Sequence, residues 1–409
     1  MQIVHKIFFS LVLLFLVYNN LNALVVSREN LADRAVAVRE SDAGTHYEVV
    51  LDYNAGLNHY DMGYTLGQKI INKNSKIEKL LDDYVSHLGF YFGDELIKRA
   101  EHIKVNIPEN YLHEIQGMAK SYAESGGKIK GEFEHDGEIS ETELFILNLV
   151  PDIARATQCS AVAVFGNSSK NGNTITGRVL DWMPHKSLTK LHSITTIKNR
   201  RGNSAAFIGF LGFGGVITAI NEKGVFAGIL DSPNGNGYQS QGRRSYTMDL
   251  RYALENFGSA KEVGEYMIAS QREYTFSHLI FLTDKTVGLV VENDLSSPQN
   301  RKIRYRNSKL NFTDKTDIKE AIIAVNSFVL KGNFDNHNSS GYNKRRWLSY
   351  INNLKISNVD DEKVDFDEIK SALYTNSRTQ QQIVYETTSN RLEIAFKNSG
   401  AFEPVKLDY

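Results

Sequence analysis

The sequence has almost no cysteine, since Cys159 is the single one among 409 residues. A lone thiol excludes an intramolecular disulfide, and by itself it makes a poor metal site. After the first residues no apolar run approaches membrane-spanning length, so the rest of the chain is expected to be soluble. Runs of one charge are absent too, and 47 basic side chains stand against 48 acidic ones. This balance argues against a nucleic-acid partner, which requires a basic face.

Motifs for metals and phosphates are also missing. The 11 histidines show no His-Glu-x-x-His spacing. A glycine-rich stretch is not followed by Gly-Lys-Ser/Thr and has strand-like flanks, so it indicates close backbone packing rather than a phosphate loop. That stretch contains Gly209, Gly212, Gly214 and Gly215. We therefore expect no metal and no cofactor.

Residues 1–23 have the pattern of a secretory signal peptide. Lys6 gives a short basic start, residues 7–18 are almost entirely apolar, and the segment ends on the small residue Ala23. The apolar run is about a dozen residues, too short to span a membrane comfortably. We predict an exported protein, in a periplasmic, secreted or lysosome-like compartment, whose mature chain begins near Leu24.

Up to residue 158 the sequence is mainly helical in character. Apolar residues recur at helical spacing over 70–88. A second amphipathic stretch covers 108–124 and starts with proline, which a first helical turn tolerates. Ser140 and Glu143 have capping-box spacing before an apolar run, and we expect that helix to end near Pro151.

From Cys159 onward the sequence predicts short strands separated by turns. Asn171-Gly172-Asn173 has the composition of a hairpin turn between the first two strands, and residues 387–390 have that of a turn between the last two. The predicted strands are 159–165, 174–181, 193–197, 205–210, 216–221, 225–230, 278–283, 286–292, 321–325, 382–386 and 391–396. The predicted helices are 246–256, 260–271 and 344–354.

Three of these segments carry polar side chains that can meet. Cys159 opens the first strand, and the next strand carries Arg178 and Asp181 in a Gly-Arg-Val-Leu-Asp-Trp motif. In an antiparallel hairpin the second strand returns beside the first, so both side chains can approach the thiol. Asn326 directly follows a later apolar strand, and Arg346 lies beyond the next loop. A buried structural thiol and a surface ion pair are the plain alternatives, and the spacing favours a functional group over them.

The order of these motifs, together with residues 221–225, resembles the choloylglycine hydrolase superfamily of N-terminal nucleophile hydrolases. That group includes bile salt hydrolases, penicillin V acylases, acid ceramidase and N-acylethanolamine acid amidase. Residues 114–119 and 147–149 are similar to the branch containing acyl-coenzyme A:isopenicillin N acyltransferase, described as autoproteolytic acyltransferase/hydrolases. The resemblance implies an α+β fold, a four-layer αββα sandwich with a mainly helical N-terminal segment.

The resemblance also implies an inactive precursor that cuts itself. Attack by the Cys159 side chain on the Gln158 carbonyl would leave residues 24–158 as a helical α subunit and 159–409 as the catalytic β subunit. The two fragments would stay associated. The new α-amino group of Cys159 would act as general base for its own thiol, or the pair would react as a pre-ionised thiolate.

The remaining catalytic roles are also implied by the resemblance. Asp181 matches the family carboxylate that orients the α-amino group, and Arg178 matches the arginine whose charge favours the thiolate. Asn326 matches the side-chain donor of the oxyanion hole. Arg346 is assigned to the late family arginine, with the adjacent Arg345 as the alternative.

Two positions depart from the family pattern. Asp231 stands where some relatives have asparagine. Its backbone N–H would still suit an oxyanion hole, whereas an ionised side chain there would oppose an oxyanion. Ser327 stands where histidine is common. Trp182, Phe210 and Phe213 neighbour the predicted site and are candidates for substrate contact.

The predicted function is that of a self-processing cysteine amidohydrolase. It would cleave a linear C–N amide bond of an N-acylated small molecule or lipid through a Cys159 acyl-thioester. An acyltransferase that passes the acyl group to an amine is the alternative, and a non-catalytic binding protein that keeps the fold is another. A papain-like pairing of Cys159 with a distant histidine such as His278 is disfavoured, because that family's cysteine signature is missing. The sequence does not specify the acyl group, the head group or the oligomeric state.

Overall fold

The computed structural model describes residues 30–73, 75–124, 133–154, 158–232, 237–269, 271–296, 298–311, 320–333, 341–356 and 362–409. The predicted signal peptide, residues 1–23, lies outside this part of the chain. No helix among the described residues is long and apolar enough to cross a membrane.

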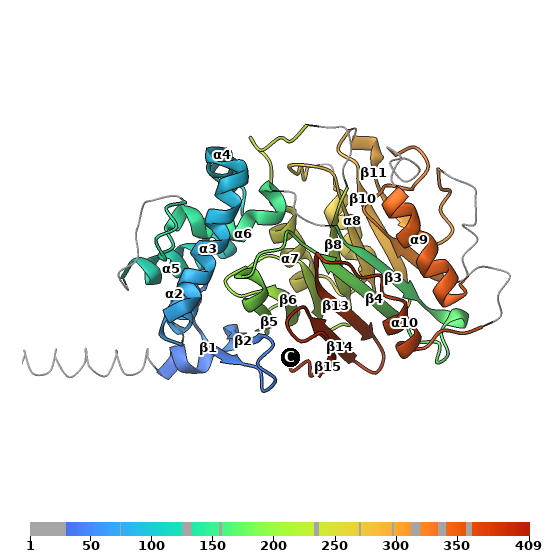
Figure 1. The fold of residues 1–409 in the computed structure, drawn as a ribbon, viewed down its shortest axis with the longest axis horizontal. Coiled ribbons are helices and arrows are strands. Elements are labelled where there is room, and N and C mark those ends of the chain that lie inside the picture. Colours follow the sequence, from blue (N-terminus) through green and yellow to red (C-terminus); the bar gives the residue numbers. More distant parts are fainter. Residues whose placement is uncertain are drawn as a thin grey trace, which may run out of the picture.

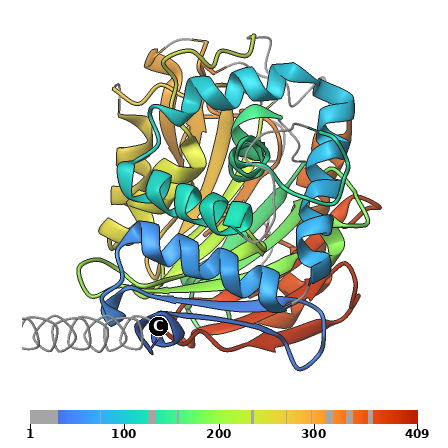
Figure 2. The same ribbon diagram turned by 90° about the vertical axis from the view of Figure 1, so that its left-hand side faces the viewer.

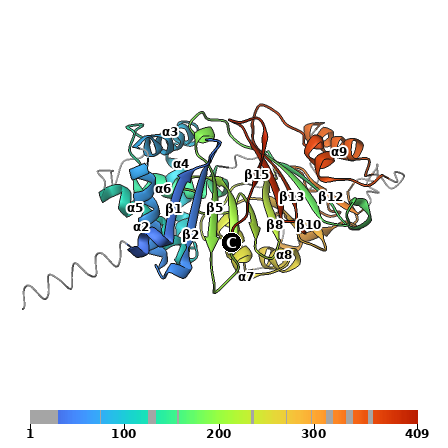
Figure 3. The same cartoon turned by 90° about the horizontal axis from the view of Figure 1, so that it is seen from below.

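Two β-sheets lie face to face in the centre of the molecule, and helices cover both outer sides (Figures 1 and 3). This is the four-layer αββα arrangement of the α+β class that the sequence predicts. One sheet has nine strands and the other has six. A large apolar core lies between the sheets and under the N-terminal helices, and a second apolar cluster lies between the six-stranded sheet and the C-terminal helices.

The nine-stranded sheet has the order β1-β2-β5-β6-β7-β8-β9-β10-β11. Its neighbouring strands are antiparallel, except that β2 runs parallel to β5 with Tyr47 opposite Ser193. Most of its strands are buried on both faces, which explains their continuous apolar runs. Its strands are β1 (Val36–Glu40), β2 (Tyr47–Asp52), β5 (His192–Lys198), β6 (Ala205–Phe210), β7 (Thr218–Asn221), β8 (Phe226–Asp231), β9 (His278–Thr283), β10 (Gly288–Asn293) and β11 (Arg301–Tyr305).

The six-stranded sheet has the order β12-β3-β4-β13-β14-β15 and is antiparallel throughout. Its strands are β3 (Ser160–Val164), β4 (Ile175–Asp181), β12 (Ala321–Ala324), β13 (Thr379–Glu386), β14 (Arg391–Phe396) and β15 (Phe402–Val405). Both predicted turns are found, since β3 pairs with β4 and β13 pairs with β14. Asn390 closes the second turn with a φ of 54°, a conformation that asparagine tolerates well.

Helices from the N-terminal segment form a thick layer on one side, and Figure 2 looks onto this layer, where α2 to α5 frame α6. Helices α7 and α8 continue the cover of the nine-stranded sheet, while α9 and α10 cover the six-stranded sheet. Their bounds are α2 (His59–Lys73), α3 (Ser75–Phe92), α4 (Asp94–Lys104), α5 (Glu109–Glu124), α6 (Glu141–Ile153), α7 (Tyr246–Asn256), α8 (Ala260–Ile268), α9 (Gly341–Leu354) and α10 (Phe366–Ala372).

The capping box expected before α6 is present. The Ser140 side chain accepts a hydrogen bond from the Glu143 backbone, and the Glu143 side chain accepts one from the Ser140 backbone. Helices α2 and α5 cross closely because each has a glycine at the contact. A side chain at Gly63 would meet the Glu114 carbonyl oxygen at 1.9 Å, and one at Gly117 would meet the Tyr60 carbonyl oxygen at 2.1 Å.

The N-terminal segment differs from the sequence prediction in one respect, because it is not only helical. It also supplies β1 and β2, which extend the nine-stranded sheet beside β5. The sequence did not reveal them because both strands are short, and because β2 joins the rest of the sheet through β5, more than a hundred residues further along the chain. Residues on both sides of the Gln158–Cys159 bond therefore share one continuous sheet.

Candidate active site

The predicted catalytic residues gather at one end of the six-stranded sheet. Strand β3 lies between β12 and β4, with Ala161 opposite both Ala324 and Arg178. This register carries Cys159, just before β3, to the same end as Asn326, just after β12. Asp181 is the last residue of β4 and belongs to this end as well.

The thiol of Cys159 lies against the guanidinium of Arg178. Both side chains are fully buried, and Arg178 Nη2 is 3.6 Å from Cys159 Sγ. Arg178 reaches across to the nine-stranded sheet, where its Nε donates to Thr218 Oγ1 at 2.8 Å and its Nη2 to the Ile229 carbonyl at 2.7 Å. Gly228 makes room for it, because a Cβ there would lie 2.6 Å from Arg178 Nη1. The guanidinium is therefore held in one position beside the sulfur.

The charge on Arg178 is a fixed feature of this site. Burial lowers the pKa of Arg178, and the neighbouring Cys159 and Asp181 act in the opposite direction. An arginine remains protonated in proteins even so. A permanent positive charge at 3.6 Å stabilises a thiolate relative to a thiol.

Asp181 is held by two donors from the start of β13. Asn376 Nδ2 and Thr379 Oγ1 each lie 2.6 Å from one of its carboxylate oxygens. Burial raises the pKa of Asp181, while Thr379, Asn376, Arg346 and Arg178 partly offset that effect. The main-chain carbonyl of Asp181 also serves the site, because it accepts from the Gln158 backbone at 3.1 Å and lies 3.9 Å from Cys159 Sγ.

Asp181→Asn is expected to raise the free energy of unfolding at pH 7 by about 1 kcal/mol. A carboxylate whose folded-state pKa is raised destabilises the folded chain as pH rises above the unfolded value, about 3.9, and asparagine removes that charge. Urea unfolding from pH 4 to pH 7 in a Cys159→Ala background measures this. A variant less stable than its parent at pH 7 would contradict the expectation.

Arg346, and not Arg345, is the arginine of helix α9 that enters the site. Arg346 is fully buried, whereas Arg345 is exposed. Arg346 Nη1 donates to the Cys159 carbonyl at 2.6 Å and contacts the Gln158 carbonyl oxygen at 3.3 Å. The guanidinium thus binds the carbonyl groups on both sides of the predicted cleavage point.

Asn326 connects this arginine to the nine-stranded sheet. Its Oδ1 accepts from Arg346 Nη2 at 2.9 Å, and its Nδ2 donates to the Asp231 carbonyl at 2.7 Å. Asp231 ends β8 and is buried. In this arrangement Asp231 enters the network through its carbonyl, which is an acceptor, and Asn326 supplies the amide that the resemblance predicts as the oxyanion donor.

Trp182, a predicted site residue, and His278, the histidine of the disfavoured papain-like pairing, both have well-defined partners. Trp182 is buried beside Phe210 and donates from Nε1 to Tyr84 OH at 2.7 Å, so it ties the site to helix α3. His278 is engaged elsewhere, because its ring nitrogens contact the Phe276 carbonyl at 3.0 Å and Asn293 Nδ2 at 2.9 Å. Burial lowers the pKa of His278 to about 3, so it stays neutral.

Three residues of the site were not predicted from the sequence. They are Asn343, Asn376 and Thr379. Asn343 donates to the Asn326 carbonyl at 2.9 Å and its Oδ1 accepts from Arg346 Nη2 at 2.5 Å. Helical spacing was a usable signal for Asn343, which lies three residues before Arg346 on the same buried face of α9. No motif marks Asn376 or Thr379.

No protein-family model and no curated protein matches the sequence. Similar solved structures include a Caenorhabditis elegans ortholog of N-acylethanolamine-hydrolyzing acid amidase, with 17% identity, a TM-score of 0.43, and coverage of 61% of this chain and 100% of that one. A mutant of conjugated bile acid hydrolase from Clostridium perfringens has 14% identity and a TM-score of 0.38, covering 61% and 92%. Penicillin V acylase from Agrobacterium tumefaciens has 10% identity and a TM-score of 0.38, covering 61% and 86%.

These are enzyme types of the group that the sequence motifs resemble. At 10–17% identity and TM-scores of 0.38–0.43, the similarity by itself assigns no substrate and no activity to this chain.

Proposed function

We propose that this chain is an exported, self-processing cysteine amidohydrolase. It cuts its own Gln158–Cys159 bond and then cleaves a linear C–N amide of an N-acylated small molecule or lipid. One observation carries the proposal: Arg178 lies 3.6 Å from the Cys159 sulfur, while Arg346 binds the Gln158 carbonyl that this sulfur would attack. Nucleophile and electrophile are each in contact with a buried positive charge.

Self-cleavage follows from these contacts. The Cys159 thiolate attacks the Gln158 carbonyl carbon, and the developing oxyanion is stabilised by the Arg346 guanidinium at 3.3 Å. The C–N bond breaks as the Cys159 nitrogen takes the proton that the thiol released, which leaves a thioester between Gln158 and the sulfur. Water then hydrolyses the thioester, giving a carboxylate on Gln158 and a free thiol and α-amino group on Cys159.

Turnover of a substrate uses the same groups. The α-amino group of Cys159 takes the proton of its thiol, and Asp181, held by Thr379 and Asn376, orients that amine. The sulfur attacks the amide carbonyl of the substrate, whose oxyanion is stabilised by the amide of Asn326. The amine of the substrate leaves, and water releases the acyl group as a carboxylate. An amine in place of water would make the same thioester an acyl donor, which is the acyltransferase alternative.

Contacts across the cleavage point support two fragments that remain associated. Strand β2 pairs with β5 along six residue pairs. Helix α5 carries Glu114, which binds Arg251 of α7 through two hydrogen bonds of 2.7 and 2.9 Å. Both side chains are buried, so the fragments 24–158 and 159–409 share a sheet and a buried ion pair.

The test is denaturing gel electrophoresis and mass spectrometry of the purified protein. The wild type is expected to give two fragments, with the second starting at Cys159, and Cys159→Ala is expected to give one intact chain. Processed protein incubated with a panel of N-acyl amides should release a carboxylate and accumulate an acyl-thioester on Cys159. An intact wild-type chain would refute self-processing. Complete processing without turnover of any amide would favour the non-catalytic binding protein.

A further inference from the structure

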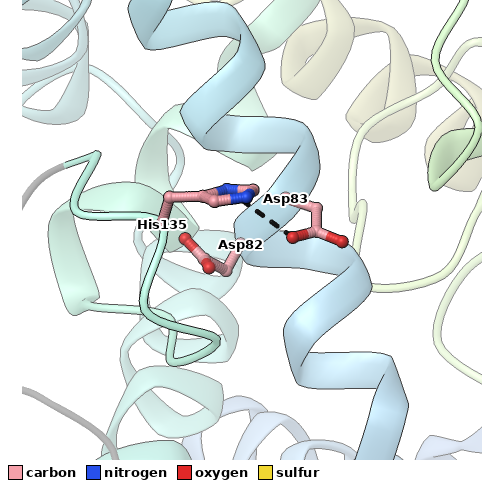
Figure 4. A group of neighbouring side chains, drawn as sticks. All are labelled: Asp82, Asp83 and His135. Carbon is pink, nitrogen blue, oxygen red and sulfur yellow. Dashed lines mark ion pairs between the residues drawn. The ribbon is translucent and has the colours of Figure 1, made fainter.

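A second group of chemistry-bearing side chains lies on helix α3 and the loop 133–139. Asp82, Asp83 and His135 each offer one possible metal-binding atom, and these atoms lie within 4.8 Å of one another. In Figure 4 the imidazole of His135 lies beside α3 between the carboxylates of Asp82 and Asp83, and a dashed line joins it to Asp83. His135 Nδ1 is 3.6 Å from Asp83 Oδ1. Two donors on one tetrahedral Zn²⁺ ion, bound at about 2.0–2.1 Å, are separated by roughly 3.4 Å.

Asp83 and His135 line a surface cavity of about 460 Å³, and two more imidazoles line it with them. His87 lies one turn after Asp83 on α3, and His185 lies in the segment that follows β4. Their rings stack with centroids 4.6 Å apart. The Nδ1 atom of His185 accepts from the Ser187 backbone at 3.3 Å.

The surroundings hold these donors in place. Asp82 is fully buried, and its oxygens accept from Ser86 Oγ at 3.0 Å and from the Gly137 backbone at 2.7 Å. Each carboxylate oxygen has a second lone pair available for a cation. His135 has a φ of 55°, a conformation unusual for a residue other than glycine, and the start of its loop is tied down by Phe133, which donates from its backbone to Glu143 at 2.7 Å.

We propose that Asp82, Asp83 and His135 bind a divalent transition-metal ion of the Zn²⁺ class. Mixed imidazole and carboxylate donors suit this class, whereas Mg²⁺ and Ca²⁺ prefer oxygen ligands alone. No spacing motif reveals such a site, because its donors come from two separate segments. The ion would join helix α3 to the loop 133–139.

Lys79 makes the proposal sharply testable. Its ammonium lies 2.8 Å from Asp83 Oδ1, one of the proposed ligand atoms, and its side chain is 57% exposed. A bound cation would displace this ammonium, which is free to turn toward solvent. Removing the lysine charge therefore strengthens metal binding, whereas a purely structural ion pair predicts no such gain.

The experiment is isothermal titration of the metal-free full chain with ZnCl₂, and with CaCl₂ and MgCl₂ in parallel. Zn²⁺ is expected to bind at one ion per chain, and about tenfold or more weakly in Asp83→Asn and in His135→Ala. Lys79→Met is expected to bind more tightly than the wild type. His113→Ala is the matched control, because this histidine is an exposed residue of α5 near Glu109 and lies outside the cluster.

Thermal unfolding with and without ZnCl₂ provides a second readout, since an ion that binds the folded chain raises the unfolding midpoint. Lys79→Met removes no donor, so it remains informative if a ligand variant fails to fold. Three outcomes would overturn the proposal: no Zn²⁺ binding by the wild type, equal binding by wild type and His135→Ala, or binding of Ca²⁺ or Mg²⁺ in preference to Zn²⁺.

Discussion

Arg346→Met is expected to slow cleavage of the Gln158–Cys159 bond by about 100- to 1,000-fold, the usual effect of removing one oxyanion donor. Arg346 Nη1 contacts the carbonyl oxygens of Gln158 at 3.3 Å and of Cys159 at 2.6 Å. Methionine fills a similar volume but has neither the charge nor the donors. The fraction of cleaved chain as a function of time after folding, measured on denaturing gels, gives the rate directly.

Arg345→Met is the matched control, because it removes the same kind of side chain from the neighbouring, exposed position of α9. Its cleavage rate should equal that of the wild type. Arg346→Lys should keep part of the activity, since a lysine retains the charge but lacks the fork of donors that reaches two carbonyls. Equal rates for Arg345→Met and Arg346→Met would contradict the role given to Arg346, provided that circular dichroism finds both variants folded.

The elements that the sequence predicts most accurately are those with uniform local character. Strands β6 and β9 and helix α7 have the predicted bounds, Ala205–Phe210, His278–Thr283 and Tyr246–Asn256. The two strands are short apolar runs between turn residues, and the helix begins with Ser245 as an N-cap. In these segments local propensity and tertiary packing agree. Strands β1 and β2 pair with each other, but they join the sheet through β5, far along the chain, and local sequence does not specify that pairing.

In the candidate site, too, the contacts between neighbouring segments were predictable and those with distant segments were not. The approach of Arg178 to Cys159 was predictable because one hairpin register brings them together, with Ala161 opposite Arg178. The sequence prediction assigns Arg346 with Arg345 as the alternative, and the helical period decides between them. The buried residues of α9 include Asn343, Arg346 and Tyr350, and Arg345 lies off that face. The donors to Asp181 come from the start of β13, a distant segment, and no local pattern identifies them.

The second large effect is expected for the ion pair buried between α5 and α7. Glu114→Gln should lower the free energy of unfolding by about 3–5 kcal/mol, because it removes one of the two carboxylates that pair with the buried guanidinium of Arg251. Arg251 binds Glu114 through two nitrogens and Glu255 through Nε at 2.8 Å, and its side chain is 2% exposed. Glutamine keeps the size of the side chain and removes the charge.

The measurement is the urea midpoint in a Cys159→Ala background, so that the chain stays covalently continuous and unfolds as one molecule. Glu265→Gln serves as control, because Glu265 pairs with Lys261 at 3.7 Å on the exposed side of α8. Exposed pairs of this kind contribute at most about 1 kcal/mol. If both variants lost a similar amount of unfolding free energy, the buried pair would have no special role in joining α5 to α7.

The pH dependence of this loss provides an independent check. Burial raises the pKa of Glu114, but the charge of Arg251 and the hydrogen bond with His59 outweigh it and hold the pKa below its ordinary value. A carboxylate with a depressed folded-state pKa stabilises the folded chain fully above its unfolded pKa, about 4.3, and loses that effect as pH falls through the folded value. The difference between Glu114→Gln and its parent should therefore be largest at neutral pH and shrink below pH of about 4. A difference that stays constant down to acidic pH would show that the lost packing, and not the lost charge, destabilises the variant.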